Sequence, residues 1–531
     1  MKPTNLTRIT PWPWRPVGLV VLSGVMMALA LPPFSLWPLA WVALVPLWQV
    51  ILSTAAGPWW RGAGYGLLWG LVYYGSSLAW ITHLHPLMWM GVPWASSVAI
   101  ALSAWGFITL WGSLCIAIWG LGLRWLARHR PAHPHLRILG GTALWCLMET
   151  LRNYTPLDWS PLSLTQSPDN LWILHLARMA GPATITAVLV ATNGFWAEAW
   201  GLRPQHLPRR GGVVLSGLIL IMLSHGVGAA LYTRPAADDP AQAMTLGLVQ
   251  GNIPTREKLT PTGVQQALQG YTDGYLALAA QGVDAVVTPE GAMPVIWQAN
   301  APQPAALIQL VRQTGVPLWL GTFAPTPGKG QRQYTQSLLE LRPDGLAYGR
   351  YNKVQLVPLG EYIPFEAVLG RLIGRLSPLD SYLVPGQAGQ RFITSLGQGI
   401  IGVCYESAYS RLFRAQARSG GAFIVTVSNN DPYPPWMMAQ HHGLDVLRAV
   451  EADRWALRVT NTGLSGLVDS HGRTRWLGKP HQYTVQTSMI YAHSWHTCYI
   501  NLGEWLTPLL LGGSLTWIAL THRIGSKPQP D

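Results

Sequence analysis

The chain has 531 residues, of which 49% are hydrophobic and only 11% are charged, and its formal net charge is +13. Soluble globular proteins carry about 25% charged residues, so this composition excludes a fully soluble protein and indicates two units, one of them in a membrane. The positive charge does not indicate a nucleic-acid partner, because it lies in short loops that flank apolar stretches. The four cysteines, Cys115, Cys146, Cys404 and Cys498, have no spacing typical of a disulfide framework or a zinc site.

Apolar stretches long enough to cross a membrane follow one another along the first 232 residues. A span needs about 20 mostly apolar residues. We therefore expect about eight spans, near 17–32, 36–53, 62–82, 94–123, 138–152, 176–200, 212–232 and 503–521. The first stretch leads directly into further spans, so it is not a cleaved signal peptide.

Basic residues gather in four segments between and beside these stretches. They are Lys2, Arg8 and Arg15; Arg124, Arg128, Arg130 and Arg137; Arg203, Arg209 and Arg210; and Arg523 and Lys527. With eight spans all four segments fall on one face, and Lys and Arg accumulate on the cytoplasmic side. The pattern predicts seven spans in 1–232, an extracytoplasmic domain in 233–502, and a last span with a cytoplasmic tail in 503–531.

Two ionisable residues, Glu149 and Arg152, lie three positions apart at the end of the fifth expected span. An ionisable residue at membrane depth is a candidate for function. At a helix end, a paired structural role is at least as good an explanation.

From residue 243 onward, short β-rich runs alternate with stretches of helical periodicity. The expected strands are MTLGLVQ, VDAVVTP, PLWLGTF, TQSLLELR, GIIGVC, AFIVTVS, WALRVT and GLSGLVD, and the expected helices are 262–280, 304–314, 408–419 and 443–453. This alternation predicts an α/β domain.

Polar residues follow three of these runs at the points where the strands end. Glu290 comes directly after VVTP, Lys353 and Glu361 lie in GRYNKVQLVPLGEYIP, and Cys404 ends IIGVC. Taken singly, Glu290 could be a helix cap, Lys353 a surface charge and Cys404 a buried core residue. Because ligands gather beyond the carboxyl ends of strands in α/β sheets, together they indicate a site.

The residue types fit acyl transfer. A thiol becomes a useful nucleophile when a base and a cation lie beside it. A carboxylate can accept the thiol proton, and an ammonium together with backbone N–H groups can stabilise the oxyanion that forms at an attacked carbonyl. Glu290, Lys353 and Cys404 would supply the base, the stabilising cation and the nucleophile.

Five segments carry a family resemblance that covers nearly the whole chain: LVQGNIP, PEGAMP, RYNKVQLVPLGEYIPF, GVCYES and NTGLSGLVDSHGR. The extramembrane block resembles the nitrilase superfamily. With spans on both sides, the chain resembles the bacterial apolipoprotein N-acyltransferases more specifically. The resemblance implies a membrane helical bundle joined to an α/β nitrilase-like domain, an αββα sandwich.

The resemblance also implies roles for individual residues. Glu290 matches the general base, Lys353 the oxyanion-stabilising lysine and Cys404 the nucleophile. Glu361 matches a second active-site glutamate, and Tyr405 and Glu406 match residues that flank the nucleophile.

Two segments depart from the family pattern. Leu259 stands where members often carry tryptophan, and residues 429–438 replace a common DAWFG sequence. Both segments would contribute to the lipid-facing mouth of the site, so lipid access and lipid preference cannot be carried over. Neither departure touches the triad.

The activity that the resemblance implies is transfer of a fatty acyl chain from a membrane phospholipid, through a cysteine thioester, to the N-terminal amine of a diacylglyceryl-cysteine apolipoprotein. The expected location is the bacterial cytoplasmic (inner) membrane, with the catalytic domain on the periplasmic face. We expect a monomer with no cofactor, no metal and no nucleic-acid partner. His441, His442 and the His83–His85 pair lack further ligands at metal spacing.

Two alternatives remain at this point. A membrane-tethered amidase that hydrolyses a carbon–nitrogen bond would use the same three residues. A transporter or an inactive scaffold belongs to another class, and the complete triad in a large extramembrane domain disfavours it.

Overall fold

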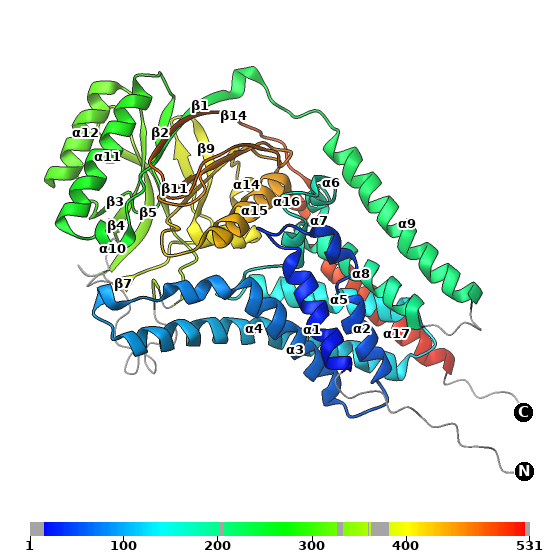
Figure 1. Ribbon diagram of the computed structural model, residues 1–531. Coiled ribbons are helices and arrows are strands. Elements are labelled where there is room, and N and C mark those ends of the chain that lie inside the picture. Colours follow the sequence, from blue (N-terminus) through cyan, green and yellow to red (C-terminus); the bar gives the residue numbers. More distant parts are fainter. Residues whose placement is uncertain (1–14, 202–206, 327–332, 359, 363–381, 526–531) are drawn as a thin grey trace, which may run out of the picture.

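A computed structural model describes residues 15–201, 207–326, 333–358, 360–362 and 382–525 (Figure 1). Lys2, Arg8, Arg203 and Lys527, which entered the prediction of orientation, lie outside these residues. Helices from the two ends of the chain form one part of the molecule, and two β-sheets between residues 243 and 491 form the other.

A helix occupies each of the eight positions where a span is expected. The longer helices are α1 (Arg15–Leu29), α2 (Val45–Ser53), α3 (Trp60–Ser77), α4 (Trp94–His129), α5 (Pro134–Asn153), α8 (Pro182–Gly201), α9 (Leu207–Tyr232) and α17 (Leu506–Gly525). Shorter helical turns connect them: η1 (Trp37–Trp41), η2 (Ala79–Leu84), η3 (Met88–Met90), η4 (Leu162–Gln166), α6 (Leu171–Leu174) and α7 (Ala177–Ala180).

The count of eight spans is not confirmed. Among the described residues, two helices are long and apolar enough to cross a membrane by length and composition, Trp94–His129 and Arg210–Tyr232. The count becomes three if Leu171–Ala180 and Pro182–Gly201 form one broken span. The chain bends by 118° between these two segments. Arg15–Leu29, Trp37–Ser53 and Leu506–Thr521 are apolar but shorter.

Small residues bring α3 and α4 into close contact. A Cβ atom on Gly66 would clash with the carbonyl of Ile116, and one on Gly120 would clash with the carbonyl of Gly62. Glycines at helix crossings of this kind let backbones approach in membrane bundles, where dispersion contacts replace the hydrophobic effect as the main attraction.

Glu149 and Arg152 have structural partners, but among the described residues the hydrogen bonds and ion pairs of each are with other residues and not with each other. Arg152 Nε donates to Asp158 Oδ1 at 2.7 Å. Glu149 accepts hydrogen bonds from the Trp145 indole, the Thr186 hydroxyl and a backbone N–H of η4. Both groups therefore stabilise the packing of the helices through neighbours that sequence spacing does not reveal.

The first sheet has the strand order β14-β1-β2-β4-β5-β6, with β3 and β7 paired at its side. Its strands are β1 (Ala243–Gln250), β2 (Ala285–Val287), β3 (Met293–Ile296), β4 (Leu318–Pro325), β5 (Gln333–Leu341), β6 (Ala347–Asn352), β7 (Tyr382–Leu383) and β14 (Thr484–Tyr491). β1, β2 and β4 run parallel, and β14, β5 and β6 pair antiparallel at the two sides.

The second sheet has the order β13-β12-β11-β10-β9-β8. Its strands are β8 (Phe392–Thr394), β9 (Gly397–Val403), β10 (Phe423–Ser428), β11 (Ala456–Thr460), β12 (Gly466–Val468) and β13 (Thr474–Leu477). β9, β10 and β11 are parallel, and β10 and β11 are buried along their whole length, as expected of strands covered on both faces.

The two sheets and four helices form an α/β sandwich. Leu248 and Trp319 of the first sheet share a buried cluster with Val425 and Leu457 of the second, so the inner faces pack on each other. Helices α11 (Pro261–Ala279) and α12 (Pro302–Thr314) cover the outer face of the first sheet, and α14 (Ser410–Arg418) and α15 (Pro435–Ala452) cover that of the second (Figure 1). The predicted αββα sandwich is thereby confirmed.

The sandwich rests on the helical bundle through its α14–α15 layer. Buried residues of α14, α15 and the bundle belong to one continuous core. Polar contacts reinforce it: Arg411 Nε donates to the Asn153 carbonyl at 3.0 Å, and the Trp159 indole donates to Gln440 Oε1 at 2.9 Å. The division into 1–232, 233–502 and 503–531 stays a prediction.

Candidate active site

Glu290, Lys353, Glu361 and Cys404 line one cleft of about 860 Å³ that opens to solvent. Glu290 follows β2 of the first sheet and Cys404 follows β9 of the second, so the cleft forms where the carboxyl ends of parallel strands from both sheets meet. Leu259, Asn429 and Tyr433 also line it, which places both departures from the family pattern at its wall.

Lys353 follows β6 and lies between two carboxylates. Its Nζ atom is 2.9 Å from Glu290 Oε1 and 2.6 Å from Glu361 Oε1. Burial acts to lower the pKa of Lys353, but the two carboxylates outweigh burial and hold that pKa well above its ordinary value. Lys353 therefore carries a fixed positive charge in the cleft.

The two carboxylates are themselves held in place by backbone donors. Glu290 Oε2 accepts from the Asn429 N–H at 2.9 Å, directly after β10. Glu361 Oε2 accepts from the Val357 N–H at 2.9 Å, and burial raises the pKa of Glu361. One oxygen of each carboxylate thus faces Lys353 while the other is anchored.

Cys404 occupies a sharp turn between β9 and the short helix η7 (Cys404–Ala408). Its φ of +52° is a left-handed conformation that non-glycine residues adopt rarely, often at functional sites. Burial, followed by the charge of Glu290, raises the pKa of the Cys404 thiol. The thiol is therefore protonated at neutral pH and needs a base to become a nucleophile.

His441 of α15 supports this turn. In the sequence, His441 was considered only as a possible metal ligand. His441 Nε2 donates to the Cys404 carbonyl at 2.8 Å, and Nδ1 accepts from Asn430 at 3.2 Å. Burial lowers the pKa of His441 to about 3, so the ring stays neutral. The two hydrogen bonds fix its tautomer and hold the backbone at Cys404.

Glu406 does not line the cleft but ties two loops together. Its Oε1 accepts from the N–H groups of Val354 and Gln355, at 2.6 and 3.1 Å, and its Oε2 accepts from the Val403 N–H at 2.7 Å and the Tyr351 hydroxyl at 3.1 Å. Burial raises the pKa of Glu406 to about 7, against the opposing effect of these donors. This carboxylate therefore sets the position of the Lys353 loop relative to Cys404.

We expect Glu406→Gln to lower stability, because the amide places N–H groups against buried donors. Leaving a buried donor without a partner costs about 1–3 kcal/mol. Thermal unfolding in detergent would measure this as a lower Tm, with Glu257→Gln, at an exposed position, as the control. An unchanged Tm would show that the Glu406 contacts do not stabilise the fold.

Tyr405 points toward the helical bundle. Its hydroxyl accepts from the Asp158 N–H at 3.0 Å and donates to the Pro156 carbonyl at 3.2 Å, and its ring stacks on Trp159. Tyr405 therefore connects the turn at Cys404 to the segment after α5, and the roles predicted for Tyr405 and Glu406 in the site stay predictions.

Within the described residues, no group of three or more His, Cys, Asp or Glu side chains could hold a metal ion. All four cysteines are free. His442 Nε2 is hydrogen-bonded to the Thr474 hydroxyl at 2.9 Å, so this histidine has a structural partner.

Two family models match the chain in separate regions. The model described as "Apolipoprotein N-acyltransferase N-terminal domain" matches residues 23–195, and that described as "Carbon-nitrogen hydrolase" matches residues 245–490. The proteins named apolipoprotein N-acyltransferase from Nostoc sp. and Thermosynechococcus vestitus are 46% and 45% identical to this chain. The matches cover 92% and 93% of this chain, and 97% and 93% of those proteins.

The chain belongs to the apolipoprotein N-acyltransferase family. It is therefore an acyltransferase of lipoprotein maturation, and the amidase alternative is not better supported. Among solved structures, an amidase of the nitrilase superfamily from Nesterenkonia is similar at a TM-score of 0.37 and 19% identity, over 50% of this chain and 96% of that chain.

Proposed function

We propose that Cys404 carries the acyl group between a phospholipid donor and a lipoprotein acceptor, with Glu290 as base and Lys353 as oxyanion stabiliser. The observation that carries the proposal is the Glu290–Lys353–Glu361 cluster, which lines the same cleft as Cys404. A carboxylate, a fixed ammonium and a protonated thiol are the groups that acyl transfer requires.

In the first half-reaction, Glu290 takes the proton from the Cys404 thiol as Sγ attacks an ester carbonyl of the phospholipid. The oxyanion that forms is stabilised by Lys353 Nζ. Collapse breaks the carbon–oxygen bond, and the leaving alkoxide takes the proton from Glu290, which releases a lysophospholipid. Cys404 then holds a thioester.

In the second half-reaction, the α-amine of the diacylglyceryl-cysteine acceptor attacks the thioester carbonyl. Glu290 takes a proton from the amine and returns it to the Cys404 sulfur as the carbon–sulfur bond breaks. The products are an amide on the lipoprotein and the free thiol. No metal or cofactor is needed in either step, and we propose that a monomer carries out both.

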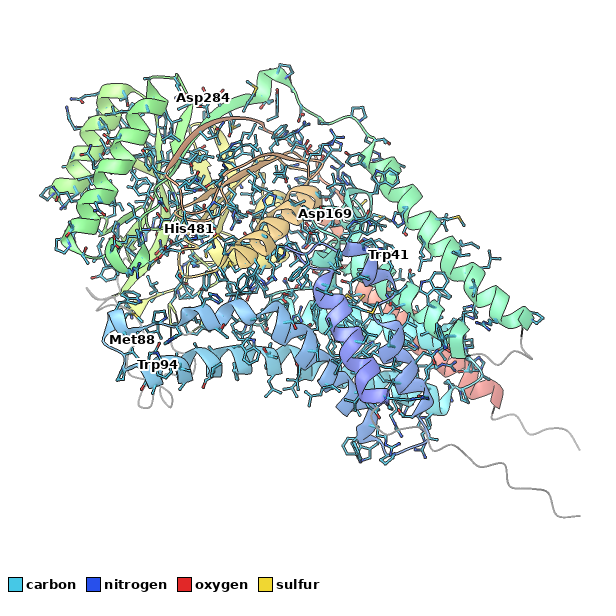
Figure 2. The ribbon with its side chains drawn as sticks, viewed as in Figure 1. Trp41, Met88, Trp94, Asp169, Asp284 and His481 are labelled. Carbon is cyan, nitrogen blue, oxygen red and sulfur yellow. The ribbon has the colours of Figure 1, made fainter. Side chains whose placement is uncertain are left out.

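Both substrates keep their acyl chains in the bilayer, so the cleft must lie close to the membrane surface. Large apolar side chains are exposed at the end of the α3–α4 hairpin, which lies beside the sheet domain in Figure 1: Met88 is 45%, Trp89 43% and Trp94 61% exposed. Figure 2 marks Met88 and Trp94 there. Aromatic residues of this kind prefer the membrane–water interface, which supports a membrane surface at that level.

The proposed orientation puts the termini in the cytoplasm and the sandwich on the periplasmic face of the cytoplasmic membrane. The start of α1 and the end of α17 lie at the end of the bundle away from the sheets (Figure 1). The basic segment 124–137, which runs from the last turns of α4 to the first turn of α5, would be cytoplasmic together with 203–211.

Cysteine labelling of intact cells tests this orientation. In a Cys498→Ser background, which removes the exposed native thiol, Gln266→Cys on α11 should react with a membrane-impermeant maleimide. His129→Cys at the end of α4 should react only after the inner membrane is permeabilised. The reverse pattern would contradict the orientation.

The acceptor distinguishes acyl transfer from hydrolysis. We expect the thioester of purified wild-type protein to persist in detergent and to be consumed at least tenfold faster when a diacylglyceryl-cysteine lipopeptide is added. Loss of the acyl group at one rate, with or without the lipopeptide, would instead favour an amidase-like hydrolase.

A further inference from the structure

A second lysine, Lys258, lies in the wall of the cleft and takes no part in the steps above. It ends the short helix α10 (Thr255–Lys258), is 5% exposed, and lines the cleft with Cys404 and Glu290. Its Nζ atom donates to the Glu290 backbone carbonyl at 3.2 Å. An ammonium has three donors, so this one neutral acceptor leaves donor capacity in the cleft.

A second donor, the side chain of Gln336 on β5, lies close to Lys258. Gln336 is 4% exposed and lines the cleft, and its Nε2 atom has no hydrogen-bond partner among the described residues. A buried amide without a partner is costly, and in a native cleft it points to an acceptor supplied by a ligand.

Gly291 keeps the space between these donors open. A Cβ atom built there would lie 3.6 Å from Lys258 Nζ and 3.4 Å from Gln336 Nε2, so the two nitrogens are no more than about 7 Å apart. One phosphate group can span that separation with a hydrogen bond of about 2.8 Å on each side. Gly291 also has a φ of +55°, which disfavours any side chain at this position.

Among the described residues, Lys258 forms no salt bridge, so its ammonium is the group in the cleft that can attract an anion. The charged residues that line the cleft are Glu290, Glu361, Lys353 and Lys258. Lys353 forms salt bridges with both carboxylates. Asp431 lies near Lys258, but its Oδ2 accepts from the Thr255 N–H at 2.7 Å. Burial lowers the pKa of Lys258 to about 8, so it is still largely charged at neutral pH.

We propose that Lys258 and Gln336 bind the phosphate of the phospholipid donor while its ester carbonyl faces Cys404. Both groups offer donors, so they select a ligand with several acceptor oxygens, and the ammonium favours one that is negative. The phosphate and the ester of one phospholipid are joined by the glycerol backbone, so both can occupy the same cleft. This inference rests on the proposed function and assigns a donor-binding role to residues outside the triad.

The test compares two acyl donors that differ in the phosphate. Thioester formation would be measured with phosphatidylethanolamine in detergent micelles and with p-nitrophenyl palmitate, which has no phosphate. For Lys258→Met, we expect the second-order rate constant of acylation by the phospholipid, relative to that by the neutral ester, to fall at least tenfold, mainly because a higher phospholipid concentration is needed for half-maximal rate. Gln336→Met should shift the ratio in the same direction by a smaller factor.

Arg256→Met is the matched control, because it removes an exposed cation from the same helical turn. We expect it to leave the ratio unchanged. A loss with Lys258→Met that is equal for both donors would overturn the inference, since Lys258 would then act on the reacting groups or on the fold. If Lys258→Met does not fold, an unchanged ratio in Gln336→Met would also overturn it.

Inorganic phosphate distinguishes a lipid headgroup from a free anion. Its addition should not accelerate the reaction of the wild type with the neutral ester. Acceleration that is lost in Lys258→Met would assign the site to free phosphate and contradict the headgroup assignment. Failure of the wild type to form a thioester with either donor would count against the proposed function, and not against this site in particular.

Discussion

Replacement of Cys404 by serine is expected to reduce both acyl uptake and acyl transfer to background. The thiol is already difficult to ionise, because burial raises its pKa, and a serine hydroxyl is far harder to ionise in the same place. Glu290 would therefore have to remove a proton from a much weaker acid. The measurement is hydroxylamine-sensitive incorporation of labelled fatty acid from phospholipid.

Cys498→Ser is the matched control for this substitution. Cys498 is exposed at the start of α16 (Cys498–Leu502) and does not line the cleft. We expect it to behave as the wild type does. Loss of labelling in Cys498→Ser, or a labile thioester in Cys404→Ser, would mean that the nucleophile is misassigned.

The second large effect is expected for Lys353→Arg, even though it keeps the charge. Lys353 is 1% exposed and directs a compact ammonium between Glu290 and Glu361. A guanidinium is planar, forked and larger. It therefore cannot fit between the two carboxylates and also direct an N–H group at the developing oxyanion as the ammonium does. Loss of one such contact typically lowers the rate by about 10²–10³-fold.

Single-turnover acylation would measure this loss, and Lys479→Arg at an exposed position is the control. Because the two carboxylates hold the pKa of Lys353 high, we expect the defect at every pH near neutrality. Near-normal turnover would remove Lys353 from the mechanism and leave it a structural cation.

Much of the catalytic domain was predictable from periodicity. The expected strands from MTLGLVQ to GLSGLVD and the four expected helices are all present, with shifts at their ends. Sequence analysis missed β3, β7, β8 and β13, which are short, and β6 and β14. In β6 and β14 the exposed faces weaken the apolar pattern. Pairing with β5 and β1 makes these segments strands, and a local pattern does not show that pairing.

The reactive residues of the candidate site could be predicted, but the residues that position them could not. Glu290 and Cys404 could be found because they stand where apolar strands end, and Lys353 and Glu361 because they lie in the motif RYNKVQLVPLGEYIPF. The contact of His441 with the Cys404 carbonyl could not be predicted, because 37 positions separate the two residues and no motif connects them. Lys258 was missed for a similar reason, since a lysine in a polar turn looks like a surface charge.

The membrane region shows a different limit. A helix lies at every position where hydropathy predicted a span. Only two or three of the described helices are long and apolar enough to cross a membrane, so an apolar stretch does not by itself define a span. Glu149 and Arg152 illustrate the same point, because their partners come from η4, α8 and the segment after α5.

Intact-mass analysis after incubation with a defined phospholipid tests the central claim most directly. The account predicts one added acyl chain, located on the peptide that contains Cys404, present without an acceptor and removed when a diacylglyceryl-cysteine lipopeptide is supplied. An unmodified mass under conditions where the lipopeptide is acylated would contradict it, as would an acyl group on any other residue.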